Sequence, residues 1–208
     1  MNDAALDRLK RETRDLVKAR LAAMSDAERR AGSAAACARV LTLDRITALG
    51  RGAAVLSYAP MGVEVDVREI GRALLRRGVT VCLPRVDWGH STMTAVRVES
   101  VDHGLVSGRR GVAEPPDGEE IEPGGLAVIV VPGVAFDASC VRLGRGGGFY
   151  DRFLGKPGVR AFTIGIGYDE QVVPRTPAED ADARMDAVVT PGRVFTAGAG
   201  ETGPRVSE

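Results

Sequence analysis

The chain has 208 residues, of which 44% are hydrophobic and 4% aromatic, and its 28 basic side chains balance 28 acidic ones. This length is typical of one domain with a buried, mainly aliphatic core. Zero net charge argues against a dedicated nucleic-acid or anionic-membrane binder, and the sequence has no apolar run of the roughly 20 residues that a membrane span requires.

The cysteines and the N-terminus indicate a cytoplasmic protein. Cys37, Cys82 and Cys140 are odd in number and far apart, which fits a reducing compartment better than a disulfide framework. The first residues, MNDAALDRLKRETRDL, are too highly charged for a secretory signal. The two histidines have no metal-ligand spacing, so a zinc site is not predicted. We expect a monomer that binds small molecules and has no nucleic-acid or membrane partner.

Apolar periodicity predicts two helices at the start of the chain. Leucines and a valine recur at helical spacing among charges from Asp3 to Ala23. Ser25 and Glu28 then have the S-x-x-E spacing of a capping box, so a second helix is expected from there to about Leu41.

A β-α-β unit is predicted next. The apolar run AAVLSY at 53–58 has the character of a buried strand, VEVDVREIGRALLRR at 63–77 has one apolar helical face that ends at Gly78, and VTVCLP at 79–84 has the character of a second buried strand. Such units imply a parallel sheet with helices on its faces.

The rest of the chain is predicted from hydrophobic runs and turn residues. An antiparallel or edge strand is expected at 92–98, a long acidic loop at 109–123, a short helix at 149–154 and strands at 160–166 and 187–189. The stretch LAVIVVPG, 126–133, is the most hydrophobic of all and is the predicted central strand. We expect a single domain over 1–195 and a flexible tail over 196–208.

The segment VPGVAFDASCVRLGRGGGFYDRF, 131–153, carries the chemistry. It runs from a buried strand through a loop to a helix start, which is where open α/β sheets bind ligands. Glycines leave backbone N–H groups free to approach a phosphate, Arg142, Arg145 and Arg152 add positive charge, and Asp151 is placed to hold a divalent cation. The pattern is neither a Walker A loop nor a dinucleotide fingerprint, so a ligand-free turn stays open at this point.

These residues resemble a known family. RLGRGGGFYDR, 142–152, preceded by VPGVAFD, is similar to the R-L-G-x-G-x-G-Y-Y-D-R signature of 5-formyltetrahydrofolate cyclo-ligases. Five further matches follow the family's order. They are Lys10 with Arg14, E-V-D at 64–66, LPRV at 83–86, E-P at 114–115 and IGIGYDEQVV at 164–173 with Asp182 and Asp186.

The resemblance implies a fold and a reaction. The fold is a three-layer α/β/α sandwich with a mostly parallel central sheet, like that of ribose-phosphate isomerases and sugar-phosphate deaminases. The reaction is the ATP-dependent cyclisation of 5-formyltetrahydrofolate to 5,10-methenyltetrahydrofolate, with Mg²⁺ as cofactor and ADP and phosphate as the other products.

The resemblance also implies a role for each matching residue. Lys10 and Arg145 are the expected catalytic residues, and Asp151 and Asp182 the expected Mg²⁺ ligands. ATP would be bound by Lys10, Arg14, Arg142, Leu143, Gly144, Arg145, Gly146, Gly147, Gly148, Phe149 and Tyr150. The folate would be bound by Glu64, Arg145, Gly146, Gly147, Gly148 and Phe149.

Simpler interpretations accompany several of these roles. Lys10 and Arg14 also fit a solvated basic helix face, and Glu64 fits an ordinary charge near a helix N-terminus. The chain departs from the family pattern at Phe149, where a tyrosine is usual, and before Asp182, where histidine is often found. A relative that binds nucleotide or folate without cyclisation, and a sugar-phosphate isomerase on the same fold, are therefore the alternatives.

Trp88 and Cys140 have two readings each. Trp88 and His90 follow the LPRV strand end and either line a pocket or anchor a loop. Cys140 lies beside the glycine loop, but this reaction needs no thiol, so a small buried residue is expected there. The excess of arginine, 25 residues against the three lysines Lys10, Lys18 and Lys156, is attributed mainly to overall composition.

Overall fold

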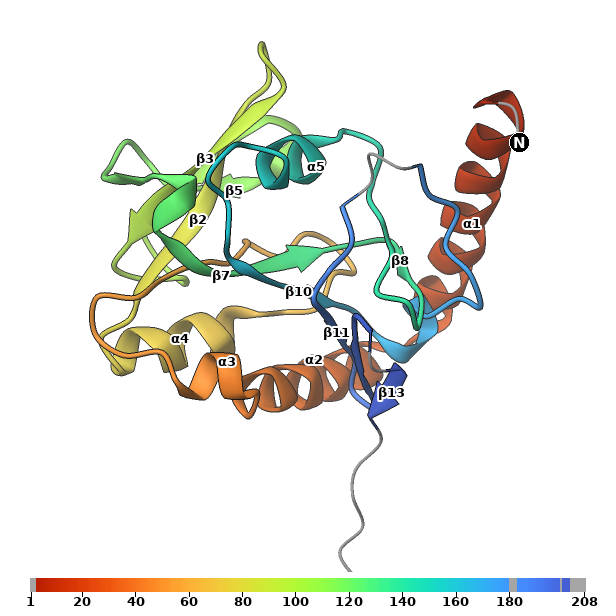
Figure 1. The fold of residues 1–208 in the computed structure, drawn as a ribbon, viewed down its shortest axis with the longest axis horizontal. Coiled ribbons are helices and arrows are strands. Elements are labelled where there is room, and N and C mark those ends of the chain that lie inside the picture. The colour runs from red at the N-terminus through yellow and green to blue at the C-terminus, as the bar shows by residue number, and fades with distance from the viewer. Residues whose placement is uncertain (1–2, 180–182, 199, 203–208) are drawn as a thin grey trace, which may run out of the picture.

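A nine-stranded sheet forms the centre of the molecule (Figure 1). The computed structural model describes residues 3–179, 183–198 and 200–202. The strands lie in the order β13-β12-β11-β10-β7-β1-β2-β3-β6. Their bounds are β1 Ala54–Leu56, β2 Thr80–Asp87, β3 Thr92–Val98, β6 Glu120–Ile121, β7 Leu126–Pro132, β10 Phe162–Ile166, β11 Ala187–Val189, β12 Val194–Thr196 and β13 Gly200–Thr202.

The five inner strands, β11, β10, β7, β1 and β2, are parallel to one another, and the strands outside them pair antiparallel. β7 is the middle strand, as its hydrophobic run predicts. Val128 and Val130 pack into the core on one face of the sheet, while Ile129 and Val131 pack on the other. A strand buried on both faces must be apolar at every position, which explains why this run does not alternate.

Helices cover both faces, which confirms the α/β/α architecture. One face carries α2 (Asp26–Leu41), α3 (Asp44–Thr47) and α4 (Arg68–Arg76), and α1 (Asp3–Ala23) buries Val17 and Leu21 in the same core (Figure 1). The opposite core contains Phe153 of α5 (Phe149–Leu154) and Phe136 of the hairpin β8 (Ala135–Phe136) to β9 (Arg142–Leu143). The layer on this opposite face consists largely of loop, and this loop contains the glycines 144 and 146–148.

The two N-terminal helices form as predicted. α1 has the bounds that periodicity indicates, and Ser25 caps α2. The Ser25 hydroxyl accepts from the Glu28 N–H at 3.2 Å, and the Glu28 carboxylate accepts from the Ser25 N–H at 2.7 Å. Both orphan donors of the first turn are therefore satisfied locally.

The helix expected over 63–77 begins only at Arg68. The preceding residues form an irregular segment whose backbone bonds to distant side chains instead of to a helical turn. The Tyr58 hydroxyl donates to the carbonyl of Val65 at 2.9 Å, and the N–H of Asp66 donates to the Ser33 hydroxyl at 3.0 Å. These tertiary hydrogen bonds replace the helical ones, so the helical pattern of the side chains does not decide the backbone there.

Two other regions differ from expectation. The acidic segment 109–123 is not a plain loop, because it contains η1 (Arg109–Gly111), β5 (Ala113–Glu114), β6 and the start of η2 (Pro123–Gly125), with β5 pairing to β4 (Val106–Ser107). β3 is antiparallel to both of its neighbours, which confirms one of the two expected alternatives, and it is not an edge strand because β6 lies outside it. β12 and β13 extend the sheet into the range 196–208 that we predicted to be a tail.

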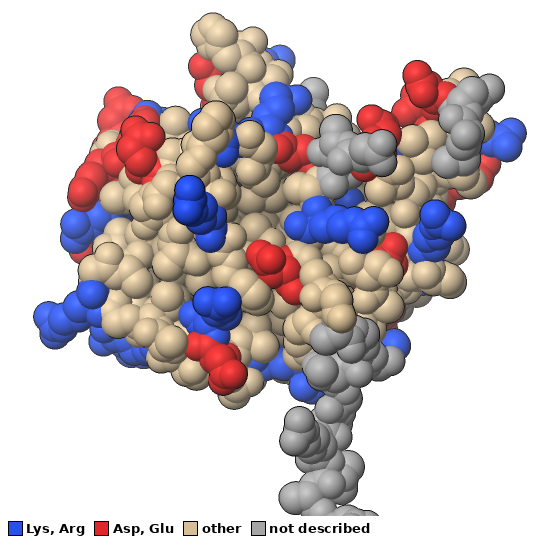
Figure 2. Space-filling view, in the orientation of Figure 1, with Lys and Arg blue, Asp and Glu red and all other residues tan. Residues whose placement is uncertain are grey.

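Charge on the molecular surface follows the balanced composition. On the face shown in Figure 2, basic and acidic side chains are interspersed, with no broad region of one sign. Within the described ranges, the structure contains no helix with the length and apolar character needed to cross a membrane.

Candidate active site

A mainly apolar cavity opens at the carboxyl ends of the parallel strands. The chain leaves β1 toward β2 on one side and later returns to β7 on the other side of β1, so the order of the strands reverses between β1 and β7. Such a switch point leaves a crevice outside the strand ends where ligands bind. Tyr58 and Ala59, after β1, and Pro132 and Gly133, at the end of β7, line the cavity.

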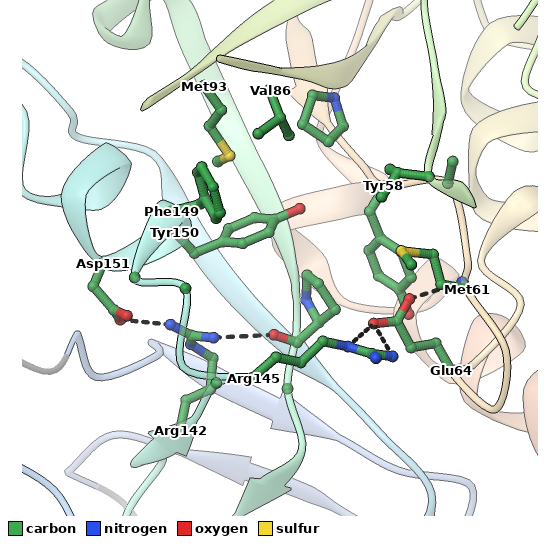
Figure 3. A pocket seen from close by; sticks show the side chains of 18 of the residues that line it. Tyr58, Met61, Glu64, Val86, Met93, Arg142, Arg145, Phe149, Tyr150 and Asp151 are labelled. Atoms are coloured by element: carbon green, nitrogen blue, oxygen red, sulfur yellow. Dashed lines mark hydrogen bonds and ion pairs between the residues drawn. The ribbon is translucent and has the colours of Figure 1, made fainter. Parts of the chain in front are cut away.

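The cavity has a volume of about 370 Å³ and a mixed lining. Tyr58, Met61, Val86, Met93, Phe149 and Tyr150 contribute apolar surface, and Glu64, Arg142, Arg145 and Asp151 contribute charge (Figure 3). An apolar pocket with a few converging polar groups is typical of a small-molecule site.

The glycine loop owes its path to residues without side chains. Gly146 has φ 97° and Gly148 has φ 64°, a region that residues with a Cβ rarely adopt. A Cβ on Gly148 would lie 2.7 Å from an Arg152 nitrogen, and one on Gly147 would lie 2.9 Å from the Phe149 ring. The loop is thus a close-packed wall of the cavity.

Arg142 and Asp151 anchor the loop at its two ends. The Arg142 side chain is only 4% exposed, and its Nη2 donates to Asp151 Oδ1 at 2.5 Å while its Nη1 donates to the carbonyl of Pro132 at 3.2 Å (Figure 3). This arrangement joins the end of β7 to the first turn of α5. Arg142 therefore lies under the loop, and Leu143, beside it, is buried in the core.

Arg145 spans the mouth of the cavity and reaches Glu64. Its Nη2 and Nε lie 2.8 and 3.0 Å from Glu64 Oε1, and Glu64 Oε2 accepts the N–H of Met61 at 2.9 Å (Figure 3). Both carboxylate oxygens of Glu64 are engaged, although the Arg145 side chain is 56% exposed and that of Glu64 only 11%. The structure thus brings together two site residues that are 81 positions apart in sequence.

Arg14 reaches the same loop from α1, and Lys10 lies one helical turn before it on that helix. Arg14 Nε donates to the carbonyl of Gly144 at 3.0 Å, and a Cβ on Gly146 would lie 3.7 Å from an Arg14 nitrogen. Lys10 is buried and its Nζ lies 2.8 Å from Glu179 Oε1. These contacts contradict a freely solvated basic face. Neither residue lines the apolar cavity, so the Arg14 guanidinium meets the loop outside the cavity.

Tyr150 presents an unused polar group to the site. Its hydroxyl is buried and has no hydrogen-bond partner among the described residues. Burial, with a smaller contribution from the Glu64 charge, raises the pKa of Tyr150 above its ordinary value, so the phenol is protonated at neutral pH and can donate. A buried donor without a partner is costly unless a ligand supplies an acceptor.

The described carboxylates do not form a metal cage. No cluster of three or more His, Cys, Asp or Glu side chains with metal-binding geometry occurs in the ranges that the structure covers. Asp151 faces the cavity and is paired with Arg142. Asp182, the second expected ligand, lies outside the described residues. Asp151 is therefore the one carboxylate of the expected pair that the structure places at the cavity, and Mg²⁺ commonly uses one or two carboxylates together with substrate phosphates and water.

Several residues that shape the site were not singled out from the sequence. Gln171 is buried, and its amide donates to the carbonyls of Gly133 and Val134 at 2.8 and 3.0 Å, which holds the start of the loop after β7. Asp137 accepts the N–H groups of Ser139 and Thr176. Both residues lie in stretches that match the family pattern, 164–173 and VPGVAFD, but a single sequence does not show that they are buried or what they bond to.

Cys140 is fully buried, as expected, and has φ 61°, a backbone conformation that favours glycine. Trp88 lines the cavity and packs edge-on against Phe149, with ring centroids 5.2 Å apart. The pocket-lining reading of Trp88 is confirmed. Arg152 does not point to a free phosphate position, because its Nε donates to the carbonyl of Ser91 at 2.7 Å.

Comparison with known proteins gives a consistent result. The model of the 5-formyltetrahydrofolate cyclo-ligase family matches residues 7–191. The 5-formyltetrahydrofolate cyclo-ligase of Mycolicibacterium smegmatis is 36% identical over 152 residues, 70% of this chain and 77% of that protein, and the one of Escherichia coli K12 is 32% identical over 177 residues, 76% and 96%. The NMR structure of Aquifex aeolicus 5,10-methenyltetrahydrofolate synthetase superposes with a TM-score of 0.78 at 31% identity, covering 96% of this chain and 97% of that one.

Proposed function

Because the chain belongs to the 5-formyltetrahydrofolate cyclo-ligase family, we propose that it closes 5-formyltetrahydrofolate to 5,10-methenyltetrahydrofolate at the expense of ATP, releasing ADP and phosphate. The observation that carries this proposal is the glycine loop, which is contacted by the Arg14 guanidinium of α1 and also lines an apolar cavity that contains Glu64. A polyphosphate suits the guanidinium and a pterin the cavity.

The chemistry explains why two substrates must meet across one loop. An N-formyl group is an amide whose oxygen is a poor leaving group. In the proposed reaction the formyl oxygen attacks the γ-phosphorus of ATP and the bond to ADP breaks. N10 then attacks the activated formyl carbon, N10 loses its proton, and phosphate departs with the formyl oxygen. Such phosphoryl transfer depends on positioning and on spreading negative charge.

The charged residues would serve this reaction by position. Lys10, Arg14 and Arg145 would bind phosphate oxygens together with the backbone N–H groups of 144–148. Glu64 would accept two N–H groups of the pterin, in place of Arg145 and Met61. Tyr150 would donate to the substrate from the cavity wall, and Phe149 would contact it through its ring.

Mg²⁺ would be held by Asp151 and Asp182 together with the phosphates. Its contribution would be to neutralise charge on the phosphate chain. Arg142 pairs with Asp151 and would keep that carboxylate directed toward the loop.

The test is an absorbance assay in which ATP and Mg²⁺ are omitted in turn. Purified protein with 5-formyltetrahydrofolate and MgATP should generate the near-ultraviolet absorbance of methenyltetrahydrofolate, and omission of ATP or Mg²⁺ should abolish it. Calorimetric binding of both ligands without any product would instead support the alternative of a binding protein without cyclisation. The expected monomeric state and cytoplasmic location stay predictions, to be checked by sedimentation and by cell fractionation.

A further inference from the structure

The cavity has two chemically different ends. Glu64 and Arg145 occupy one end, while Phe149, Met93 and Val86 occupy the other, and the Tyr150 ring lies between them (Figure 3). A ligand that uses both ends must itself be polar at one end and apolar further along.

An indole extends the apolar end. Trp88, on the turn between β2 and β3, lines the cavity, and its ring meets that of Phe149 at an interplanar angle of 73°. This edge-to-face contact fixes the two aromatic planes relative to each other. The Arg152 guanidinium lies 5.5 Å from the Phe149 centroid and its Nε bonds to Ser91 in the same turn, so the turn is tied to α5.

A guanidinium packs on the Trp88 indole without itself lining the cavity. Arg109 Cζ is 5.7 Å from the Trp88 ring centroid, and Val112, three residues further along, lines the cavity. Arg109 is exposed, and within the described part of the chain no carboxylate forms an ion pair with it. Stacking on the indole holds this cation in place while leaving its donors available to an anion.

We propose that Trp88 and Arg109 form the subsite for the arylglutamate part of the folate. The order of groups along the cavity, carboxylate, aromatic wall, guanidinium, matches the order along the substrate, pterin, aminobenzoyl ring, glutamate. Trp88 contacts the aminobenzoyl ring, and Arg109 binds a glutamate carboxylate. This assignment rests on the proposed function, and it makes Arg109 a residue that discriminates folates by their carboxylate tail.

The experiment compares two substrates, 5-formyltetrahydrofolate and 5-formyltetrahydropteroate, which lacks the glutamate. Wild type should prefer the former in kcat/KM. Arg109→Ala should reduce that preference about two- to fivefold, through KM with kcat unchanged, because an exposed ion pair has this strength. The preference of wild type should also fall at high salt, which screens such a pair.

Arg76→Ala is the matched control, since it removes an exposed arginine on α4, which packs on the opposite face of the sheet. It should leave the preference intact. An unchanged preference in Arg109→Ala, or an equal loss in Arg76→Ala, would overturn the role of Arg109. Wild-type turnover of 5-formyltetrahydrofolate in the same experiment separates this failure from a failure of the proposed function.

Trp88 is tested separately. Trp88→Ala should raise KM for both substrates about two- to tenfold, and Trp88→Phe should recover part of the loss. Because Trp88 is the single tryptophan, its emission reports on the site directly, and it should change when wild type is titrated with 5-formyltetrahydrofolate. Unchanged emission at saturating substrate, or an unchanged KM in a folded Trp88→Ala protein, would refute the contact.

Discussion

The buried pair of Arg142 and Asp151 predicts an asymmetric response to mutation. Arg142 is 4% exposed, whereas the Asp151 side chain is 26% exposed. Asp151→Ala therefore leaves a buried guanidinium without its counter-charge, and we expect a loss of about 3–5 kcal/mol in the free energy of unfolding. Arg142→Met removes the buried charge, and the remaining carboxylate can be hydrated, so its loss should be smaller, about 1–2 kcal/mol.

Equilibrium unfolding in urea at pH 7, followed by circular dichroism, measures both losses. In a chain of this size each 1 kcal/mol corresponds to about 2–4 °C in melting temperature, so Asp151→Ala should melt at least about 6 °C lower. Glu69→Ala, which breaks an exposed pair with Arg76, is the control and should cost less than about 1 kcal/mol. Equal losses in Asp151→Ala and Arg142→Met, or a greater loss in the latter, would refute the reasoning from burial.

Three further outcomes follow from the same contacts. Gly148→Ala should lower stability by about 1 kcal/mol or more and reduce turnover, because φ is 64° and the new Cβ would meet Arg152; thermal melting and steady-state rates measure this. Tyr168→Phe should lower the free energy of unfolding by about 1 kcal/mol and raise KM for the folate. The buried Tyr168 hydroxyl bonds to Ser33 at 2.8 Å, and Ser33 in turn bonds to the segment that carries Glu64. Wild-type stability and KM in this variant would contradict the prediction. Burial raises the pKa of Cys140 to about 11 and that of Cys82 to about 12, so a thiol reagent at pH 8 should label these cysteines only after unfolding, and labelling of the native protein would contradict this. Because the thiols of the unfolded chain lose their protons at lower pH than those of the folded chain, the free energy of unfolding should fall as pH rises from about 9 toward 11 and 12.

Local patterns predicted the elements whose stability is decided locally. The capping box of α2 and the uninterrupted hydrophobic run of β7 specify a helix start and a doubly buried strand without reference to distant residues. The segment 63–67 has a helical pattern but bonds through its backbone to Ser33 and Tyr58, which no local pattern contains. The strands β5 and β6 are two residues each, too short for a period to be read from them.

Some parts of the candidate site could be predicted from the sequence and others could not. The glycine loop and its charged residues were predictable, because the family signature is contiguous and its glycines have a steric reason to be there. The apolar walls were not, because Tyr58, Val86 and Met93 come from three strands or their ends and meet only in the folded sheet. The pairing of Arg145 with Glu64 across 81 residues likewise depends on the switch point between β1 and β7.

The zero net charge has a counterpart within the site. Arg142, Arg145 and Lys10 each hold a carboxylate, namely Asp151, Glu64 and Glu179, at distances of 2.5–2.8 Å. The cations expected to receive a polyphosphate are therefore compensated before it arrives, which is why composition alone could not reveal a polyanion site. In the proposed reaction, binding would exchange the Glu64 carboxylate for a phosphate at Arg145, and the released carboxylate would be available to the pterin. The same ion pair thus keeps the empty cavity neutral and makes its two charged halves available together.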